Sequence, residues 1–275
     1  MAAEMSAEFK RPSRGMYILP SLFTAGNIAV GYYAIMQAIY GSATHDANAF
    51  DRSALAIVFA ILFDGLDGRI ARMTNTQSAF GAELDSLADV IAFGVAPSLL
   101  AYLWGVKQVI GEEAPQVHAH LVHFGIVVCF LFLICGACRL ARFNVSVDPK
   151  PRNPGRPGRK YFVGMPIPAG AGCLAAVVHF ESGSPIYNPW MSCLWLALIA
   201  FIGFLMVSSW RFWSGKEIDM SSRRPARLLV LVVVFGAIMF EWSEKGLIVL
   251  AMSYLVSGVV ARLAYSWQRR SESAA

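Results

Sequence analysis

Four aspartates in two short stretches are the residues of this sequence best suited to chemistry. Asp64 and Asp67 lie in FDGLDGRIAR, and Asp85 and Asp89 lie in FGAELDSLAD. On helices the first pair is spaced i and i+3 and the second i and i+4, so each pair projects from one face. The intervening MTNTQSAFGA is small and polar enough to turn the chain back. We therefore expect the four carboxylates to share one pocket.

The cost of burying these carboxylates predicts that the pocket holds cations. The apolar run ALAIVFAILF precedes Asp64, and an Asp at the centre of a membrane helix costs about 2.5–3.5 kcal/mol. Four carboxylates gathered closely also repel one another. Two divalent cations would cancel their charge, and oxygen ligands favour Mg²⁺ or Mn²⁺, with Ca²⁺ as an alternative. Two such ions about 3.5–4 Å apart form a clamp for displacement at phosphorus.

The elements that position these aspartates are membrane helices by composition. Of 275 residues, 56% are hydrophobic and only 15% are charged. Because each span needs about 20 mostly apolar residues, we expect an all-α integral membrane protein with about eight transmembrane helices. The expected spans are 17–40, 53–72, 86–106, 121–142, 163–180, 191–211, 226–242 and 246–266.

Basic residues predict how the spans are oriented. With both termini on one side, twenty Lys and Arg residues fall on that side and three on the other. This asymmetry predicts cytoplasmic termini and a cytoplasmic pocket. The net charge of +5 then reports topology and attraction to lipid head groups, not nucleic-acid binding. The basic segment 143–162 is either a flexible linker or a contact for a head group.

Other residues that suit chemistry have simpler interpretations. The five cysteines lie in apolar segments, and Cys135 and Cys138 are better explained as packing residues than as a redox pair. His118, His120 and His123 are expected in a solvated outer loop rather than at a metal site. The first fifteen residues, MAAEMSAEFKRPSRG, lack the apolar core of a removable signal peptide. We expect them to form an amphipathic lead-in at the membrane surface.

Small residues beside the aspartates leave room for a ligand. Gly68 and Ala71 keep one helix face bare, and Gly81 does so on the next helix, although small residues also permit close helix packing. Arg72 is placed to reach a phosphate with its fork of donors, the alternative being a charge that only orients the helix. Arg69 points elsewhere, so orientation suffices for it.

Residues 64–89 resemble the signature of the CDP-alcohol phosphotransferases, membrane enzymes that transfer a phosphoalcohol from a cytidine diphosphate donor to a hydroxyl and release CMP. The pattern is D-x2-D-G-x2-A-R-x8-G-x3-D-x3-D. All eight positions match, namely Asp64, Asp67, Gly68, Ala71, Arg72, Gly81, Asp85 and Asp89. The resemblance implies a six-helix catalytic core at 16–213, followed by two additional helices in 214–266 and a cytoplasmic tail at 267–275.

The resemblance also implies roles for single residues. Asp64, Asp67 and Asp85 would hold two divalent cations, and Asp89 would face a cation while accepting the proton of the attacking hydroxyl. The residues implied to bind the CDP group are Gly68, Ala71, Arg72, Gly81 and, with weaker support, Ser78. A homodimer is implied as well.

Further blocks bear on which alcohol is the acceptor. ILPSLFTAGNIAVGYYAI, CRLARFNV, YFVGMPIPAGAG and FLMVSSWRFWSGKEID resemble segments of the bacterial membrane-integral phosphatidylserine synthases. This likeness implies CDP-diacylglycerol as donor, L-serine as acceptor, and a location in the bacterial cytoplasmic membrane. Arg139, Arg142 and Asn144 are then expected near the serine carboxylate or the donor phosphate. For the two arginines, orientation charge is an equal alternative.

Two other functions remain open from the sequence. A sibling enzyme would use glycerol 3-phosphate as acceptor, because the signature does not specify the alcohol. A cation transporter would also carry acids within the membrane. A transporter, however, predicts acids spread across the bilayer depth, whereas these four are expected at one cytoplasmic level.

Overall fold

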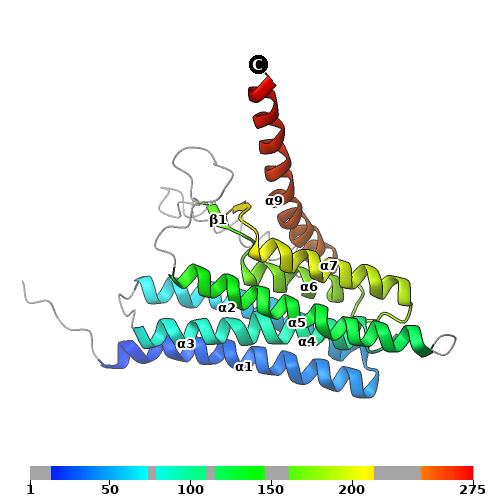
Figure 1. The fold of residues 1–275 in the computed structure, drawn as a ribbon. Helices are drawn as coiled ribbons and strands as arrows, with labels where there is room; N and C mark the ends of the chain where they lie inside the picture. Colours follow the sequence, from blue (N-terminus) through cyan, green and yellow to red (C-terminus); the bar gives the residue numbers. More distant parts are fainter. Residues whose placement is uncertain (1–13, 74–78, 110–114, 146–160, 214–242, 275) are drawn as a thin grey trace, which may run out of the picture.

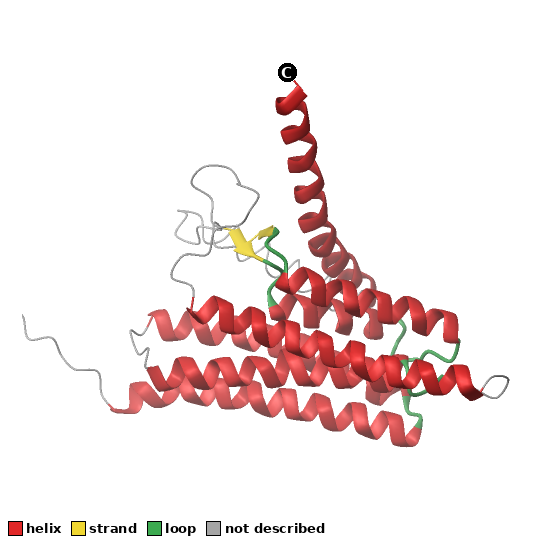
Figure 2. Cartoon of the chain, in the orientation of Figure 1, coloured by secondary structure: helices red, strands yellow, loops and turns green. Residues whose placement is uncertain are grey.

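The protein is a bundle of long helices with a small sheet on its side, next to the start of α6 and the end of α7 (Figure 1; Figure 2). The computed structural model describes residues 14–73, 79–109, 115–145, 161–213 and 243–274. The elements are α1 (Arg14–Thr44), α2 (Ala47–Met73), α3 (Ala79–Asp89), the π-helix η1 (Val90–Val95), α4 (Ala96–Gly105), α5 (Pro115–Val145), β1 (Tyr161–Val163), α6 (Ile167–Phe180), α7 (Pro189–Val207), β2 (Arg211–Trp213) and α9 (Ser243–Ala274). A predominantly helical fold was expected, and this is confirmed.

Five of the described helical stretches are long and apolar enough to cross a membrane. They cover 22–44, 80–105, 118–145, 189–207 and 243–265, and a shorter apolar helix covers Ile167–Phe180. The chain is therefore a membrane protein. The expected span at 226–242 lies outside the described residues, so the total of eight spans and the six-helix core stay predictions.

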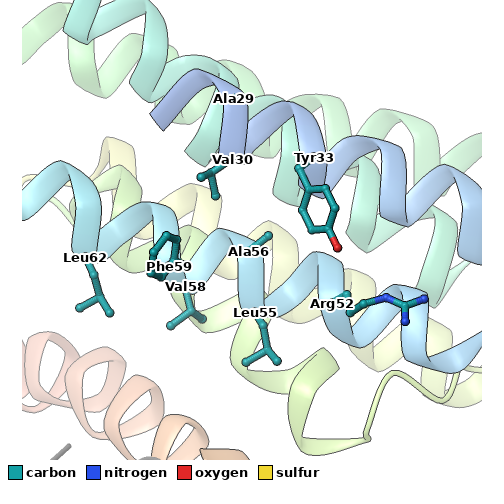
Figure 3. A pocket seen from close by; sticks show the side chains of 9 residues that line it. All are labelled: Ala29, Val30, Tyr33, Arg52, Leu55, Ala56, Val58, Phe59 and Leu62. Carbon is teal, nitrogen blue, oxygen red and sulfur yellow. The ribbon is translucent and has the colours of Figure 1, made fainter. Parts of the chain in front are cut away.

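Large apolar side chains on the outer surface agree with a lipid environment. An open groove of about 650 Å³ lies between α1 and α2, and nearly all of its lining is apolar (Figure 3). It is lined by Ala29, Val30, Tyr33, Arg52, Leu55, Ala56, Val58, Phe59 and Leu62. Phe59 is 50% and Leu62 61% exposed. Exposure on this scale along a helix is expected where hydrocarbon, not water, is the solvent.

Close helix packing depends on glycines opposite large side chains. A Cβ on Gly105 of α4 would lie 2.2 Å from the Trp195 ring of α7. Trp195 in turn meets Trp104 edge-on, with ring centroids 5.2 Å apart, and donates its Nε1–H to the carbonyl of Ala101 at 3.0 Å. Both tryptophans are buried, so burial and the ring contact together fasten α7 to α4.

Two expectations about local structure are wrong. His118, His120 and His123 lie on α5, not in an outer loop, because Pro115 begins the helix at a position where its missing N–H costs nothing. The spans expected at 163–180 and 191–211 are also too long, because α6 begins only at Ile167 and α7 already ends at Val207. There the chain leaves the helices and pairs β1 with β2, antiparallel, with Phe162 opposite Phe212.

Candidate active site

Neighbouring helices bring three of the four predicted aspartates together. Asp64 lies on α2, while Asp85 and Asp89 lie on α3, and one carboxylate oxygen from each is within 4.8 Å of the other two. The expected convergence is thus confirmed for these three residues. Asp67 is on the described part of α2, but its side chain lies outside the described residues.

Asp89 carries an unusual oxygen. Its Oδ1 is buried and has no hydrogen-bond partner among the residues that the structure describes. A buried acceptor without a partner is costly and needs an explanation such as an ion or a ligand. Three converging carboxylates, one of which has this unpartnered oxygen, form a donor set that suits a hard divalent cation. The cluster can therefore hold a metal ion.

The helix changes its winding directly after Asp89. Residues Val90–Val95 form the π-helix η1, and Ala92, Phe93 and Gly94 within it are buried. Such wide turns occur mostly inside α-helices and often at functional sites, because the extra residue redirects the side chains on either side. The sequence contains no Pro here that would have predicted the change. The π-helix sets the orientation of Asp89 relative to the core behind it.

Arg139 of α5 is the buried cation of the site. It is 7% exposed, and its guanidinium lies over the rings of Phe143 and Phe162 at 5.4 and 5.7 Å. It is close enough to Asp89 for the two charges to attract. Its Nε has no hydrogen-bond partner among the described residues. Arg139 is thus a buried guanidinium whose charge acts on Asp89 and whose Nε–H has no partner in the described part of the chain.

Arg142 bonds the protein backbone, and its expected place near the serine carboxylate or the donor phosphate stays a prediction. Its guanidinium donates to the backbone carbonyls of Val207 at 3.0 Å, Val163 at 3.2 Å and Ser208 at 3.5 Å. These bonds join the end of α7 to β1. The arrangement favours a positioning role for Arg142. A small cavity of about 30 Å³ lies between Arg142, Arg139 and the β1 residues.

Asn144, the third residue expected near the acceptor, lies at the end of α5 and forms a hydrogen bond with α3. Its Nδ2–H donates to the Ser86 hydroxyl at 2.9 Å, next to Asp85 in sequence. Asn144 is therefore close to the carboxylate helix but uses this donor to hold it.

The residues expected to bind CDP are largely outside the described part of the molecule. Gly68, Ala71 and Arg72 belong to the helical part of α2, but their side-chain surroundings are not described, and Ser78 is not described at all. Gly81 lies half-buried on α3. The CDP subsite therefore stays a prediction.

Helix α9 packs against the sheet that lies next to Arg139, and the sequence did not indicate this contact. Tyr254 of α9 donates its O–H to the carbonyl of Trp213 in β2 at 3.1 Å. A Cβ at Gly258 would lie 2.2 Å from the ring of Phe212. Because β2 pairs with β1, which supplies Phe162 to Arg139, α9 supports the arginine through the sheet. Apolar periodicity alone does not specify such a contact.

Known proteins resemble the chain over most of its length. A family model described as CDP-alcohol phosphatidyltransferase matches residues 17–183. A Helicobacter pylori protein named CDP-diacylglycerol–serine O-phosphatidyltransferase is 36% identical over 249 residues, which cover 90% of this chain and 92% of that protein. A Bacillus subtilis protein of the same name is 34% identical over 200 residues, covering 72% and 90%. A Mycobacterium bovis protein of that name is 33% identical, covering 81% and 70%. The three carboxylates thus belong to a matched catalytic domain, and the chain belongs to the CDP-alcohol phosphatidyltransferase family.

Proposed function

We propose that this protein transfers the phosphatidyl group of CDP-diacylglycerol to the hydroxyl of L-serine, giving phosphatidylserine and CMP. The observation that carries the proposal is the convergence of Asp64, Asp85 and Asp89 at one end of a membrane bundle. The relatives that cover most of the chain bear names stating this activity. A lipid donor also explains why the site belongs to membrane helices.

In the proposed reaction the serine hydroxyl oxygen attacks the phosphorus attached to diacylglycerol. The new phosphorus–oxygen bond forms as the bond to the CMP oxygen breaks, and CMP leaves with the bonding electron pair. The hydroxyl proton passes to Asp89, whose unpartnered buried Oδ1 is a ready acceptor. An ordinary carboxylate is a weak base for an alcohol, so proton transfer must accompany the attack.

The proposed cofactors are two divalent cations, Mg²⁺ or Mn²⁺, with Ca²⁺ as the alternative. Asp64, Asp67, Asp85 and Asp89 would hold them, and the buried orphan oxygen of Asp89 supports a cation at this point. When bound, the cations would offset the charge of the phosphates and of departing CMP. The positions of the aspartates determine where that positive charge would lie.

Arg139 is the proposed partner of the serine carboxylate. Its guanidinium is buried between two rings, where a charge-assisted hydrogen bond is stronger than in water. Arg142 and Asn144 would act indirectly, by holding β1 and α3. Gly68, Ala71, Arg72, Ser78 and Gly81 are proposed to line the CDP subsite.

The basic residues support a location in the bacterial cytoplasmic membrane, with both termini and the site on the cytoplasmic side. The proposed segments are a lead-in at 1–15, a catalytic core at 16–213, two further helices in 214–266 and a tail at 267–275. A homodimer is proposed from the family resemblance alone.

Release of CMP tests the activity directly. Purified protein in detergent is incubated with CDP-diacylglycerol, Mg²⁺ or Mn²⁺, and either serine or glycerol 3-phosphate. We expect serine-dependent CMP and phosphatidylserine. Release of CMP that requires glycerol 3-phosphate and ignores serine would overturn the acceptor, and a lack of CMP with every alcohol would overturn the enzymatic function.

A further inference from the structure

Helix α1 places two polar side chains on a buried face. Thr24 is 3% exposed and Asn27 only 2%, within the otherwise apolar segment FTAGNIAV. Gly31 follows Asn27 by four residues, so all three lie on one face of the helix. A Cβ on Gly31 would stand 2.9 Å from the Cα of Ala92. This face of α1 therefore packs on the helix that continues from Asp89.

The direction of the helices gives the depth of Asn27. Helices α1 and α3 begin at the same end of the bundle and run side by side (Figure 1). One turn back from the contact between Gly31 and Ala92, Asn27 is level with Ala88, next to Asp89. Asn27 is thus at the depth of the carboxylates on α3.

Packing against α2 gives the same depth independently. A Cβ on Gly26, the residue before Asn27, would lie 3.4 Å from the ring of Phe63. Phe63 is the residue before Asp64. Two neighbouring helices therefore place the Asn27 amide at the level of the carboxylate pocket.

The amide of Asn27 lacks the partners that a structural residue would have. Both Oδ1 and Nδ2 are buried, and neither has a hydrogen-bond partner within the described part of the chain. A neutral amide offers two donors and an acceptor, and leaving all of them unmade in an apolar bundle is costly. The Oδ1 of Asp89 is in the same state. Two orphan groups at one depth of the bundle point to a polar ligand at this level.

We propose that Asn27 binds the acceptor amino acid and selects it over alcohols that lack an ammonium group. The inference rests on the proposed function. The amide carbonyl accepts a hydrogen bond from the ammonium of serine, and the amide nitrogen donates to its carboxylate. Glycerol 3-phosphate has no ammonium and could offer the Asn27 carbonyl only a neutral hydroxyl, whose hydrogen bond is weaker than one from a charged donor. Asn27 therefore sets specificity, while Asp89 takes the proton.

Replacement of the amide by an apolar group of similar size tests this inference. Asn27→Leu removes the orphan polar atoms, so its Tm should equal or exceed that of the wild type. We expect the KM for serine to rise about 10- to 100-fold, because bonds to two charged groups are lost. The KM for CDP-diacylglycerol should stay within about twofold. Gln37→Leu, on the same helix but bonded to Arg52, is the control and should leave both KM values unchanged.

Each outcome decides the inference separately from the proposed function. An Asn27→Leu protein with a wild-type KM for serine would show that the amide has no ligand, and a selective rise in the KM for CDP-diacylglycerol would assign it to the donor instead. Asn27→Ala provides the same comparison if the leucine variant does not fold. Failure of the wild type to release CMP with serine would overturn the function itself, before any variant is assayed.

Discussion

Helix α2 carries Asp51 near its start and Asp64 toward its end, and these two aspartates have opposite surroundings. Asp51, near the start of α2, contacts Nδ1 of His179 on α6, and Nε2 of that histidine lies 2.9 Å from the Ser243 hydroxyl on α9. Asp64, thirteen residues later and therefore about 20 Å along the helix, lies with two further carboxylates and close to the unpartnered Oδ1 of Asp89. The Asp51 end is a satisfied polar cluster, whereas the Asp64 end brings three carboxylates together and leaves Oδ1 of Asp89 without a partner among the described residues.

The difference separates a structural cluster from a ligand site. At the Asp51 end each polar group meets a group of complementary type, and the bonds join three helices. At the Asp64 end three acidic groups converge, and the repulsion between their charges is relieved when a cation or substrate enters. Residue type alone does not distinguish these ends, because a Ser, His and Asp cluster also resembles a catalytic arrangement.

The same substitution at both ends gives the largest contrast. Asp89→Asn should lower the rate of CMP release by about 10³-fold, because the proton acceptor is lost, while Tm stays near that of the wild type. Asp51→Asn keeps an oxygen that accepts from His179, so activity should remain within about twofold of the wild type. CMP release with serine and thermal unfolding are measured for both. Substantial turnover by Asp89→Asn would remove Asp89 from the role of base.

Removal of divalent cations should affect only the carboxylate end. A chelator is expected to abolish turnover and to lower Tm, since a ligand present at 100 times its Kd stabilises the fold by about 2.7 kcal/mol. Restored Mg²⁺ or Mn²⁺ should reverse both effects. The shift in Tm should vanish in Asp85→Asn and persist in Asp51→Asn. An equal shift in both variants would place the cation elsewhere.

The carboxylate site could be predicted from the sequence because its residues lie in two neighbouring stretches of the chain. The spacing of Asp64, Asp85 and Asp89 over two helices and one turn was enough to predict their convergence, and the structure confirms it. The helical class followed from apolar length in the same way.

The Asp51 end and the sheet could not be predicted because they depend on contacts between distant segments. Asp51 and His179 are 128 positions apart in the sequence, and each alone reads as an isolated polar residue. Phe162 and Phe212 pair across β1 and β2 in segments whose apolar composition suits a helix equally well. The sequence around Arg142 likewise did not indicate that its guanidinium donates to the carbonyls of Val163 and Val207. Tertiary packing decided all of these.

A glycine at the Asp51 end provides the next effect in size. Gly183 has φ +71°, and a Cβ there would lie 2.0 Å from the carbonyl oxygen of Ala47. Gly183→Ala should therefore lower the free energy of unfolding by about 3 kcal/mol. Gly65→Ala is the control beside Asp64, because a Cβ at Gly65 meets nothing within 4 Å. Equal Tm values for the two alanine variants would show that the tight turn at Gly183 does not require a glycine.

The histidine of the satisfied cluster gives the smallest effect. His179→Ala leaves the Asp51 carboxylate and the Ser243 hydroxyl without their partner, and should lower the free energy of unfolding by about 1–2 kcal/mol. The KM for serine should not change at temperatures well below Tm, because the cluster lies at the other end of α2 from the carboxylates. His123→Ala is the matched control, since exposed His123 bonds the carbonyl of Ala119 in its own helix and its replacement should change stability by less than about 0.5 kcal/mol. A loss of turnover in His179→Ala with Tm unchanged would mean that the two ends are coupled through α2, and that the cluster at Asp51 does more than hold three helices together.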